Sequence, residues 1–344
     1  MEIGAPTGSE RMTYKHGLVL GKFWPLHAGH SNLIESALAQ CDRVTVQVLA
    51  NTAEDIPMEV RAAWVREVHP RAHVVSAYDD APVDFDDPAI WDQHMLIINA
   101  LLDAPVDAVF TSDEYGAELA RRLHASWVQI DPGRRENAIS GTAVRANPEA
   151  YWTRLSPCVR AYYVRRVVVT GAESTGTTTL AQALAAHFGC PWVPEYGREW
   201  SETRPEGPFA PWRTEEFVTI AQTQIAHEEI AARQTPNRWL ICDTDALATT
   251  LWHERYMGHA SGEVERIADA HPKPYARILT GDDIPFVQDG LRDGEHLRHA
   301  MQQRFRDVLS DPQRRGAPCI EVSGSIEQRL EAALAFLRKL GASS

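Results

Sequence analysis

A glycine-containing turn between a strand and a helix, near the start of the chain, constrains the fold more than any other stretch. Residues 17–30 read Gly-Leu-Val-Leu-Gly-Lys-Phe-Trp-Pro-Leu-His-Ala-Gly-His. This pattern predicts a buried strand, a tight turn and a helix that begins near Gly29. Gly21 and Gly29 let the backbone approach a ligand, and a helix N-terminus offers unpaired N–H groups and a positive dipole end. The stretch therefore predicts a phosphate site.

Basic side chains of the same stretch fit that chemistry. His27 and His30 are three residues apart, so both imidazoles can face one pocket if the turn leads directly into the helix. Lys22 supplies a cation beside them. We therefore expect His27, His30 and Lys22 to hold phosphate groups, with Phe23 as part of the same turn.

Strands and helices alternate through residues 16–163, which we take as the first of two domains. This alternation predicts an α/β fold with a parallel sheet of the Rossmann type, in which ligands lie at the carboxyl ends of the strands. The strands expected after the first one are 43–49, 72–75 and 107–111, and the expected helices include 59–68 and 88–102.

A second helix N-terminus is predicted at residues 139–145, which read Ile-Ser-Gly-Thr-Ala-Val-Arg. Ser140 is a good helix cap, and Arg145, about one turn later, is suited to bridging phosphate oxygens. With Thr142, these residues are expected to bind phosphate. Trp91 has two interpretations: it packs in the core, or it stacks on the ring of a substrate.

A fresh strand at residues 166–170 opens the second expected domain, residues 164–344, and leads into a glycine-rich loop. Residues 171–179 read Gly-Ala-Glu-Ser-Thr-Gly-Thr-Thr-Thr, the layout of a P-loop in which Thr177 stands where the lysine belongs. The loop N–H groups can still cradle phosphates, and Thr178 can still ligate Mg²⁺. The residues expected to bind phosphate here are Gly171, Glu173, Ser174, Thr175, Gly176, Thr177, Thr178 and Thr179.

The substitution at Thr177 removes the ammonium group that follows charge onto the β- and γ-phosphates during transfer. One charge-assisted contact contributes roughly 1.5–3 kcal/mol, or about one to two decades in rate. Phosphoryl transfer by this domain therefore requires another cation. Arg292 and Arg298 are the candidate replacements.

Acidic residues complete the second expected site. Asp243 ends an apolar strand, the usual place for a carboxylate that holds Mg²⁺ or faces a substrate hydroxyl. Residues 195–199, Glu-Tyr-Gly-Arg-Glu, follow another strand, and residues 286–292 are suited to a loop that covers phosphate. The residues expected to bind substrate are Glu195, Tyr196, Arg198, Asp245 and Asp289, together with Trp91 in the first domain.

In this order, and over nearly the whole chain, the motifs resemble those of the NadR family of bifunctional nicotinamide-nucleotide adenylyltransferases and ribosylnicotinamide kinases. The resemblance implies a Rossmann-like HxGH nucleotidyltransferase domain followed by a P-loop kinase-like domain. It implies adenylyl transfer from ATP to nicotinamide mononucleotide, and a kinase-like domain for nicotinamide riboside, with Mg²⁺ as cofactor. The catalytic residues that it implies are His27, His30, Lys22, Arg145 and Asp243, and the Mg²⁺ ligands are Thr178 and Asp243.

Two alternatives remain at this point. The P-loop domain can be a nucleotide-binding regulatory or structural module attached to a working adenylyltransferase, because of Thr177. The HxGH motif alone also allows another acceptor, such as a pantetheine or flavin phosphate, although the second-half motifs favour nicotinamide.

Composition narrows the class of partner. A net charge of −13 argues against a nucleic-acid-binding face, which needs basic surface. Five scattered cysteines indicate a reducing cytosol, and no apolar run predicts a signal peptide or a membrane span. We expect a cytoplasmic protein with small-molecule partners, and a homo-oligomer stays open. Residues 1–15 are expected to be a flexible leader, too short for the helix-turn-helix repressor domain that some family members carry.

Overall fold

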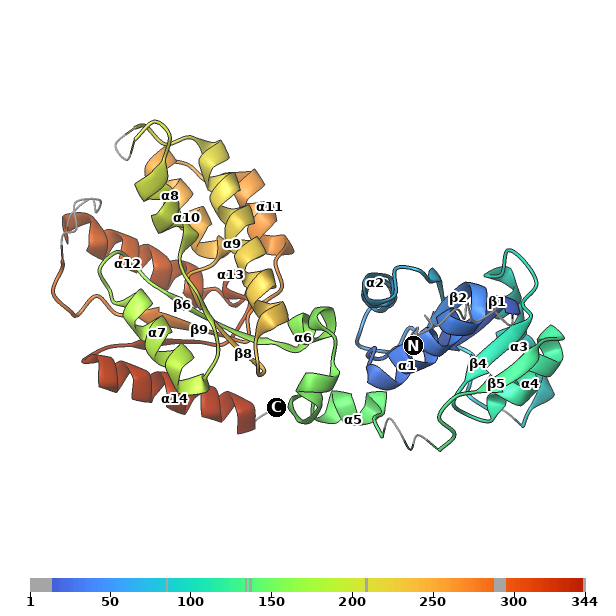
Figure 1. Ribbon diagram of the computed structural model, residues 1–344. Helices are drawn as coiled ribbons and strands as arrows, with labels where there is room; N and C mark the ends of the chain where they lie inside the picture. The colour runs from blue at the N-terminus through green and yellow to red at the C-terminus, as the bar shows by residue number, and fades with distance from the viewer. Residues whose placement is uncertain are drawn as a thin grey trace, which may run out of the picture. The chain divides into compact units, whose positions relative to one another are not determined.

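The computed structural model describes residues 14–342 except residues 85, 134, 136–137, 208–209 and 288–294. The chain divides into two compact units, residues 1–159 and 160–344. Each unit holds one five-stranded sheet (Figure 1). Most of the expected leader lies outside the described residues. The expectation is wrong for Tyr14 and Lys15, because they already belong to the first strand, where Tyr14 pairs with Cys41.

In the first unit, all strand pairs are parallel and the strand order is β3-β2-β1-β4-β5. The middle of the central strand is buried, and Leu18 and Val19 in it are fully buried. The connections reverse direction beside β1, which is where ligands bind in such sheets. The strands are β1 (Tyr14–Gly21), β2 (Cys41–Ala50), β3 (His73–Tyr78), β4 (Ala108–Thr111) and β5 (Ser126–Gln129).

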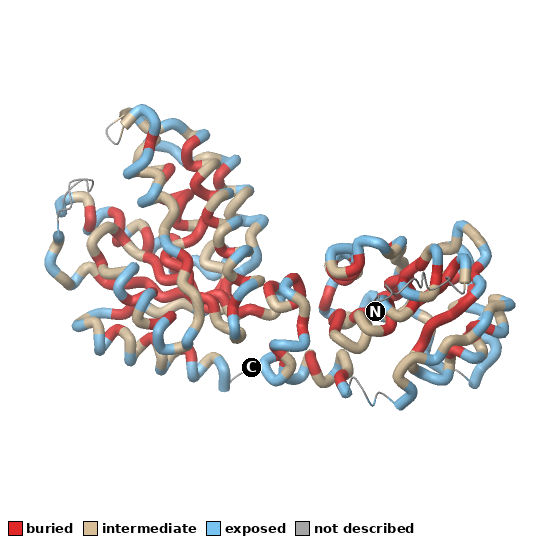
Figure 2. The backbone as a smooth tube through the Cα atoms, viewed as in Figure 1, coloured by how far each residue is buried: buried red, intermediate tan, exposed pale blue. Residues whose placement is uncertain are grey.

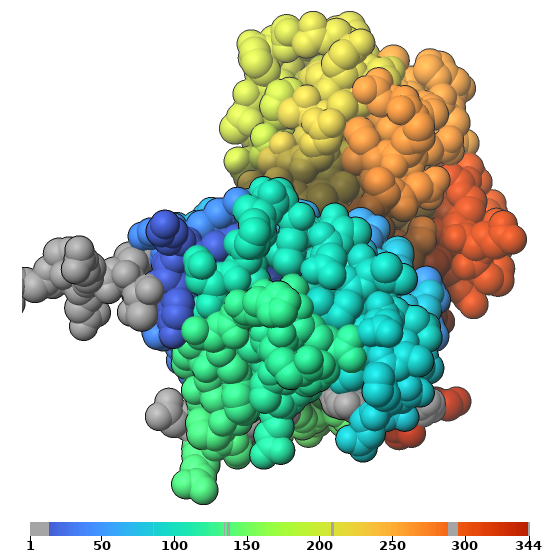
Figure 3. All heavy atoms as spheres, turned by 90° about the vertical axis from the view of Figure 1, so that its right-hand side faces the viewer, coloured from blue at the N-terminus to red at the C-terminus, as the bar shows by residue number. Residues whose placement is uncertain are grey.

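Helices cover the sheet of the first unit. Trp91, Met95 and Leu119 pack with Leu18 and Val109 of the sheet in one apolar cluster, so α3 and α4 share a face. The teal surface in Figure 3 shows the outside of this helical layer. The helices are α1 (Ala28–Gln40), α2 (Met58–Val68), α3 (Pro88–Ala100), α4 (Tyr115–Leu123), α5 (Gly141–Ala146) and a 3₁₀ helix, Glu149–Arg154.

In the second unit, the strand order is β10-β9-β6-β8-β7, again with parallel pairs. Its central strand, β6, is followed directly by the P-loop. The strands are β6 (Arg165–Thr170), β7 (Trp192–Val193), β8 (Trp239–Asp243), β9 (Ala276–Thr280) and β10 (Cys319–Val322).

Helices lie on both faces of the second sheet, and the buried residues concentrate between these layers (Figures 1 and 2). On one face, Leu180 and Leu184 of α7 and Leu337 of α14 pack on Val167 and Ile241. The helices are α6 (Pro157–Tyr163), which crosses the division between the units, α7 (Thr177–Phe188), α8 (Tyr196–Thr203), α9 (Thr214–Gln234), α10 (Ala246–Met257), α11 (Gly262–Ala270), α12 (Glu295–Ser310), α13 (Pro312–Arg315) and α14 (Ile326–Ala342).

The predicted fold class, two α/β units with parallel sheets, is confirmed. β5 has no counterpart among the predicted strands, because it is short and none of its residues is fully buried. Within the described residues, no helix combines the length and the apolar character that a membrane crossing needs.

Candidate active sites

The first unit contains a cavity of about 390 Å³ at the turn that follows β1. Polar residues reach it from the turn itself and from the ends of β3 and β4. Those that line it are Lys22, His27, His30, Asp79, His94, Ser112, Asp113, Tyr115 and Asp131, with Gly21, Gly29, Trp91 and Gly141 beside them. The cavity therefore lies where the strand order predicts a ligand.

The two histidines form one stack at the start of α1. His27 caps the helix, because its Nδ1 accepts a hydrogen bond from the backbone N–H of His30 at 3.4 Å. The ring centroids of His27 and His30 are 3.7 Å apart, and the ring of Phe23 lies 5.0 Å from that of His30. Phe23 is buried, so it supports the stack from the core. Both imidazoles line the cavity, as the spacing in the sequence predicts.

A buried carboxylate fixes the cation of this site. Glu54 Oε1 lies 2.7 Å from Lys22 Nζ, and Glu54 Oε2 lies 2.5 Å from an Arg61 nitrogen and accepts the Asn51 N–H. Burial alone would raise the pKa of Glu54, but the hydrogen bonds from Lys22, Arg61 and Asn51 outweigh it and lower that pKa. Glu54 is therefore ionised near neutral pH, and it tethers Lys22 at the edge of the cavity.

The second predicted helix N-terminus is present, but its side chains face elsewhere. Ser140 caps α5 by accepting the Ala143 N–H at 3.2 Å. Arg145 donates to the Trp24 carbonyl and to Thr142 Oγ1, and its guanidinium lies 3.3 Å from the centroid of the Trp24 ring. Ser140, Thr142 and Arg145 are not among the described residues that line the cavity. Arg145 instead contacts Trp24, which lies in the same turn as Lys22.

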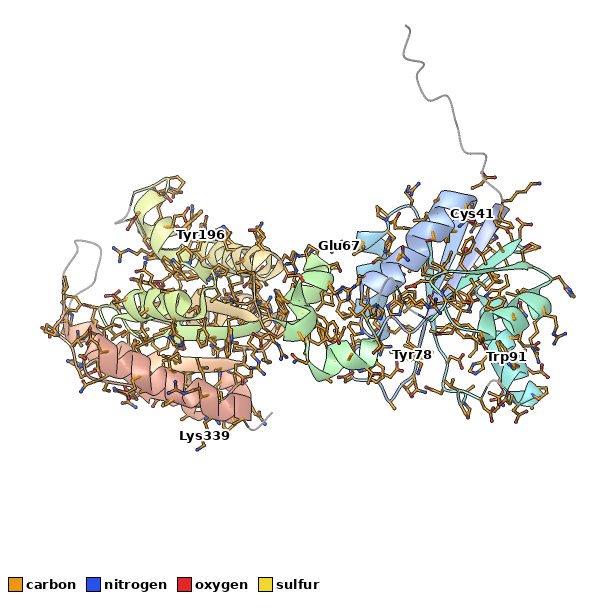
Figure 4. The ribbon with its side chains drawn as sticks, turned by 60° about the horizontal axis from the view of Figure 1, so that its bottom comes forward. Cys41, Glu67, Tyr78, Trp91, Tyr196 and Lys339 are labelled. Carbon is orange, nitrogen blue, oxygen red and sulfur yellow. The ribbon has the colours of Figure 1, made fainter. Side chains whose placement is uncertain are left out.

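Trp91 packs in the core and also lines the cavity, so its contact with a substrate ring stays a prediction. It is 4% exposed and belongs to the apolar cluster under α3, yet it also lines the cavity. Figure 4 shows it on this part of the first unit. Next to it, His94 Nδ1 lies 2.6 Å from Asp79 Oδ2. Sequence reasoning missed this pair, although Asp79 follows β3 directly, at the carboxyl end where ligands bind.

The second unit contains a cavity of about 160 Å³ around the P-loop. Ser174 and Gly176 both have positive φ, +58° and +83°, a backbone shape that turns successive N–H groups toward an anion. Gly171 cannot carry a side chain, because a Cβ there would lie 2.5 Å from Thr280 Oγ1. The loop thus keeps the geometry of a phosphate cradle with threonine at position 177.

Side chains from α12 and α14 brace the loop on its other side. Arg298 donates to the carbonyls of Ser174, Asp282 and Ile284, and Arg329 Nη1 donates to the Thr175 carbonyl at 2.6 Å. Arg298 is 4% exposed and Arg329 is 2% exposed. Arg298, a predicted replacement for the lysine, therefore supports the loop from behind. The predicted residues Arg292 and Asp289 lie outside the described residues.

The acidic end of β8 faces the first turn of α7. Thr178 Oγ1 donates to Asp243 Oδ2 at 2.5 Å, and Asp243 Oδ1 is buried without a hydrogen bond from the described residues. Burial raises the pKa of Asp243, while the hydroxyls of Thr178 and Thr177 and the charge of Arg198 act in the opposite direction. A hydroxyl and a carboxylate are the hard oxygen donors that Mg²⁺ prefers. Thr178 and Asp243 therefore fit the predicted Mg²⁺ site.

The residues predicted to bind substrate in this unit separate into two groups. Glu195 and Arg198 line the cavity. Tyr196 instead packs its ring near Trp200 and His227. Asp245 caps α10 and pairs with Arg277 at 2.8 Å, outside the residues that line the cavity.

Sequence reasoning missed an aromatic wall of the second cavity. Trp212, Phe217, Trp252 and Tyr256 all line it. The Trp212 ring lies 5.0 Å from that of Phe217 and 5.1 Å from that of Tyr256. Trp212 lies just before α9, Phe217 lies near its start, and the other two come from α10, so no local pattern in the sequence connects them.

Comparisons with known proteins agree with this division. Residues 18–147 match the cytidylyltransferase-like family, and residues 166–329 match the AAA domain family. The chain is 27% identical over 298 residues to the trifunctional NAD biosynthesis/regulator protein NadR of Escherichia coli (strain K12). The aligned residues cover 80% of this chain and 71% of that protein. It is also 26% identical over 166 residues to the nicotinamide-nucleotide adenylyltransferase of Thermococcus kodakarensis. That alignment covers 44% of this chain and 84% of that protein.

Two solved structures have a similar fold. A NadR protein in complex with NR superposes with a TM-score of 0.70 at 21% identity, and a NadR protein in complex with NAD and AMP-PNP with a TM-score of 0.69 at 20% identity. Each superposition covers 95% of this chain and 96% of the other. The order of the motifs, the two sheets and the relatives over most of the chain agree. The chain is therefore similar to NadR proteins over most of its length, and it joins a cytidylyltransferase-like unit to a P-loop unit.

Proposed function

We propose that this protein makes NAD by transferring the adenylyl group of ATP to nicotinamide mononucleotide, with release of pyrophosphate. The observation that carries this proposal is the stack of His27 and His30 at a helix N-terminus, in one cavity with Lys22 and Trp91. The similarity to nicotinamide-nucleotide adenylyltransferase and to NadR supports the choice of acceptor. We place this activity in residues 16–163.

The reaction in this cavity is an in-line displacement. A phosphate oxygen of the mononucleotide attacks the α-phosphorus of ATP, a new P–O bond forms, and the bond to the β-phosphate breaks as pyrophosphate leaves with its electron pair. His27 and His30 bind the phosphates at the start of α1, and Lys22, held by Glu54, offsets charge on the leaving group. Trp91 offers a face for the nicotinamide ring. Bound Mg²⁺ would add charge compensation. Arg145 supports the turn through Trp24, while Ser140 caps α5 and Thr142 accepts a hydrogen bond from Arg145.

We propose that residues 164–344 phosphorylate nicotinamide riboside and so supply the mononucleotide. The P-loop N–H groups bind the phosphates of ATP, and Thr178 and Asp243 hold Mg²⁺. Of the carboxylates that line the cavity, we assign Glu195 and Asp243 to the incoming hydroxyl. The aromatic wall gives a surface for the flat nicotinamide ring, which the phosphate contacts alone would not orient.

One observation favours a second candidate function for this unit. Thr177 removes the usual phosphate-binding ammonium, so the P-loop can instead serve as a nucleotide-binding module without chemistry. Only the kinase candidate releases ADP, because a module without chemistry releases nothing and adenylyl transfer by the first unit releases pyrophosphate.

The test is product analysis of the purified chain with Mg-ATP and either the mononucleotide or the riboside. We expect NAD and pyrophosphate from the mononucleotide, and ADP followed by NAD from the riboside. NAD from the mononucleotide alone, without ADP from the riboside, would support the non-catalytic module. If the mononucleotide yields no NAD, the proposed adenylyl transfer is wrong.

A further inference from the structure

The second cavity carries too little positive charge for its expected ligand. Among its described lining residues, three are acidic, Glu173, Glu195 and Asp243, and one is basic, Arg198. The triphosphate of ATP adds several negative charges, of which one Mg²⁺ compensates two. A cation from the protein is therefore needed where phosphoryl transfer develops further charge on the β–γ bridge.

Arg198 lies where such a cation can act. It is the third residue of α8, which begins soon after β7, and it lines the same cavity as Thr177, Thr178 and Asp243. Its charge is close enough to Asp243 to oppose the rise in the pKa of that carboxyl. The Arg198 side chain is 46% exposed and forms an ion pair of 3.3 Å with Glu202, which is 50% exposed. An exposed pair of this kind is weak, so the guanidinium can exchange it for a phosphate.

The two buried arginines beside the P-loop, Arg298 and Arg329, bind the protein backbone. Arg298 and Arg329 direct their N–H groups at backbone carbonyls of the loop and of the segment after β9. Neither is among the described lining residues. Moving either guanidinium to a ligand would leave buried carbonyls without partners, which costs about 1–3 kcal/mol for each. Arg298 and Arg329 therefore stabilise the conformation of the P-loop. Among the described residues that line the cavity, Arg198 is the basic one.

We propose that Arg198 supplies, from across the cavity, the positive charge that a lysine at position 177 would supply from the P-loop. This inference rests on the proposed kinase function and names the residue that compensates charge during phosphoryl transfer. In the reaction, the riboside 5′-oxygen forms a bond to the γ-phosphorus, the bond from the γ-phosphorus to the bridging oxygen breaks, and ADP keeps that electron pair. The hydroxyl proton passes to a carboxylate of the cavity. Arg198 contacts the phosphate oxygens on which negative charge increases.

The test measures ADP formation from Mg-ATP and nicotinamide riboside by the full-length chain. Adenylyl transfer releases pyrophosphate, so ADP reports the kinase step alone. We compare the wild type with Arg198→Ala, Arg198→Lys, Thr177→Lys and the double variant Thr177→Lys/Arg198→Ala. Arg266→Ala, an exposed arginine on α11, is the matched control. NAD formation from the mononucleotide is measured on every variant to check that the first unit is intact.

We expect Arg198→Ala to lower kcat for ADP formation at least tenfold, with a smaller change in KM for the riboside, and Arg198→Lys to keep part of the rate. Thr177→Lys in the Arg198→Ala background restores most of the loss, because it returns the charge from the other side. A merely structural arginine would not be rescued in this way. The control and the NAD reaction stay within about twofold of the wild type.

Other outcomes overturn the inference in distinguishable ways. An active wild type with an equally active Arg198→Ala variant overturns the role of Arg198 and leaves the kinase function standing. Loss of ADP formation that Thr177→Lys does not rescue shows that Arg198 acts on the riboside or on the fold, and not as the missing charge. A wild type that forms no ADP overturns the kinase function, and with it this inference.

Discussion

The two phosphate sites share one backbone plan but obtain their positive charge differently. Each follows the central strand of a parallel sheet and ends at a helix N-terminus, α1 in the first unit and α7 in the second. In the first unit, His27, His30 and Lys22 line the cavity. In the second, the turn itself carries no basic side chain, and the one basic residue among the described residues that line the cavity is Arg198, from α8.

The buried carboxyl groups of the two units differ in the same way. Glu54 is held ionised between Lys22 and Arg61, so burial there serves to fix a cation. Glu228 is a fully buried residue of α9, and burial, followed by the nearby charge of Asp245, raises its pKa to about 8. Its neighbour His271, 3.3 Å away, has its pKa lowered to about 4, mainly by burial. The difference is one of partners: Glu54 positions Lys22, which lines the first cavity, whereas Glu228 is not among the described residues that line the second cavity.

The strongest test of the comparison removes one of the stacked imidazoles. We expect His30→Ala to lower NAD formation from the mononucleotide by at least about a hundredfold, because a preorganised donor to developing charge is worth that much in other enzymes. ADP formation from the riboside should not change, since the second site does not use this residue. Initial rates for both products, on one preparation, check the prediction.

The matched control is His73→Ala, an exposed histidine in the same unit. It should leave both rates close to those of the wild type. If His30→Ala keeps more than about a tenth of the NAD rate, basic side chains do not dominate the first site, and the comparison between the two sites is broken.

Much of the fold was predictable because its signals are local. The alternation of β-branched strands with helices, and the capping residue Ser140, indicate elements that the structure contains. The short strand β5 was not predicted, since four residues without a buried face carry no periodicity. The roles of Tyr14 and Lys15 were also missed, because pairing with β2 recruits them into the sheet.

The site was predictable where one motif holds the residues and not where distant segments meet. His27, His30 and Lys22 fall within one turn, and the structure brings them to one cavity. Arg145 was expected at phosphate, yet it stacks on Trp24, a contact over 121 residues that no local pattern indicates. For the same reason, the sequence could not connect Trp212 with Tyr256, or Glu54 with Lys22.

A substitution with a smaller expected effect tests whether the buried Glu54 carboxylate positions Lys22. We expect Glu54→Gln to lower NAD formation about ten- to a hundredfold, because Lys22 loses the charged partner that tethers it, and a charge-assisted hydrogen bond is worth roughly 1.5–3 kcal/mol. Steady-state rates of NAD formation check the prediction. Glu59→Gln, an exposed carboxyl on α2, is the control and should have no effect. An unchanged rate in Glu54→Gln would show that Lys22 needs no tether.

The smallest expected effect tests the buried carboxyl of the second unit through stability. The folded state holds the Glu228 proton up to about pH 8, whereas the unfolded chain releases it near the ordinary glutamate pKa of 4.5. The unfolded state therefore binds fewer protons in this window, so the stability from Glu228 is complete below pH 4.5 and is lost as the pH rises through 8. The loss is at most about 1.4 kcal/mol for each pH unit.

Glu228→Gln removes this titration while it keeps the shape of the protonated acid. We therefore expect the wild type to unfold at a lower temperature at pH 8.5 than at pH 6, and the variant to show a smaller decrease, by a few degrees. Thermal unfolding at both pH values measures this, with the exposed Glu215→Gln on the same helix as the control, which should follow the wild type. If the wild type and Glu228→Gln lose stability equally, Glu228 is already ionised in the folded protein. The Arg166 guanidinium, 4.0 Å from that carboxylate, would then act on it as Lys22 and Arg61 act on Glu54, and the contrast between the two buried carboxyl groups would disappear.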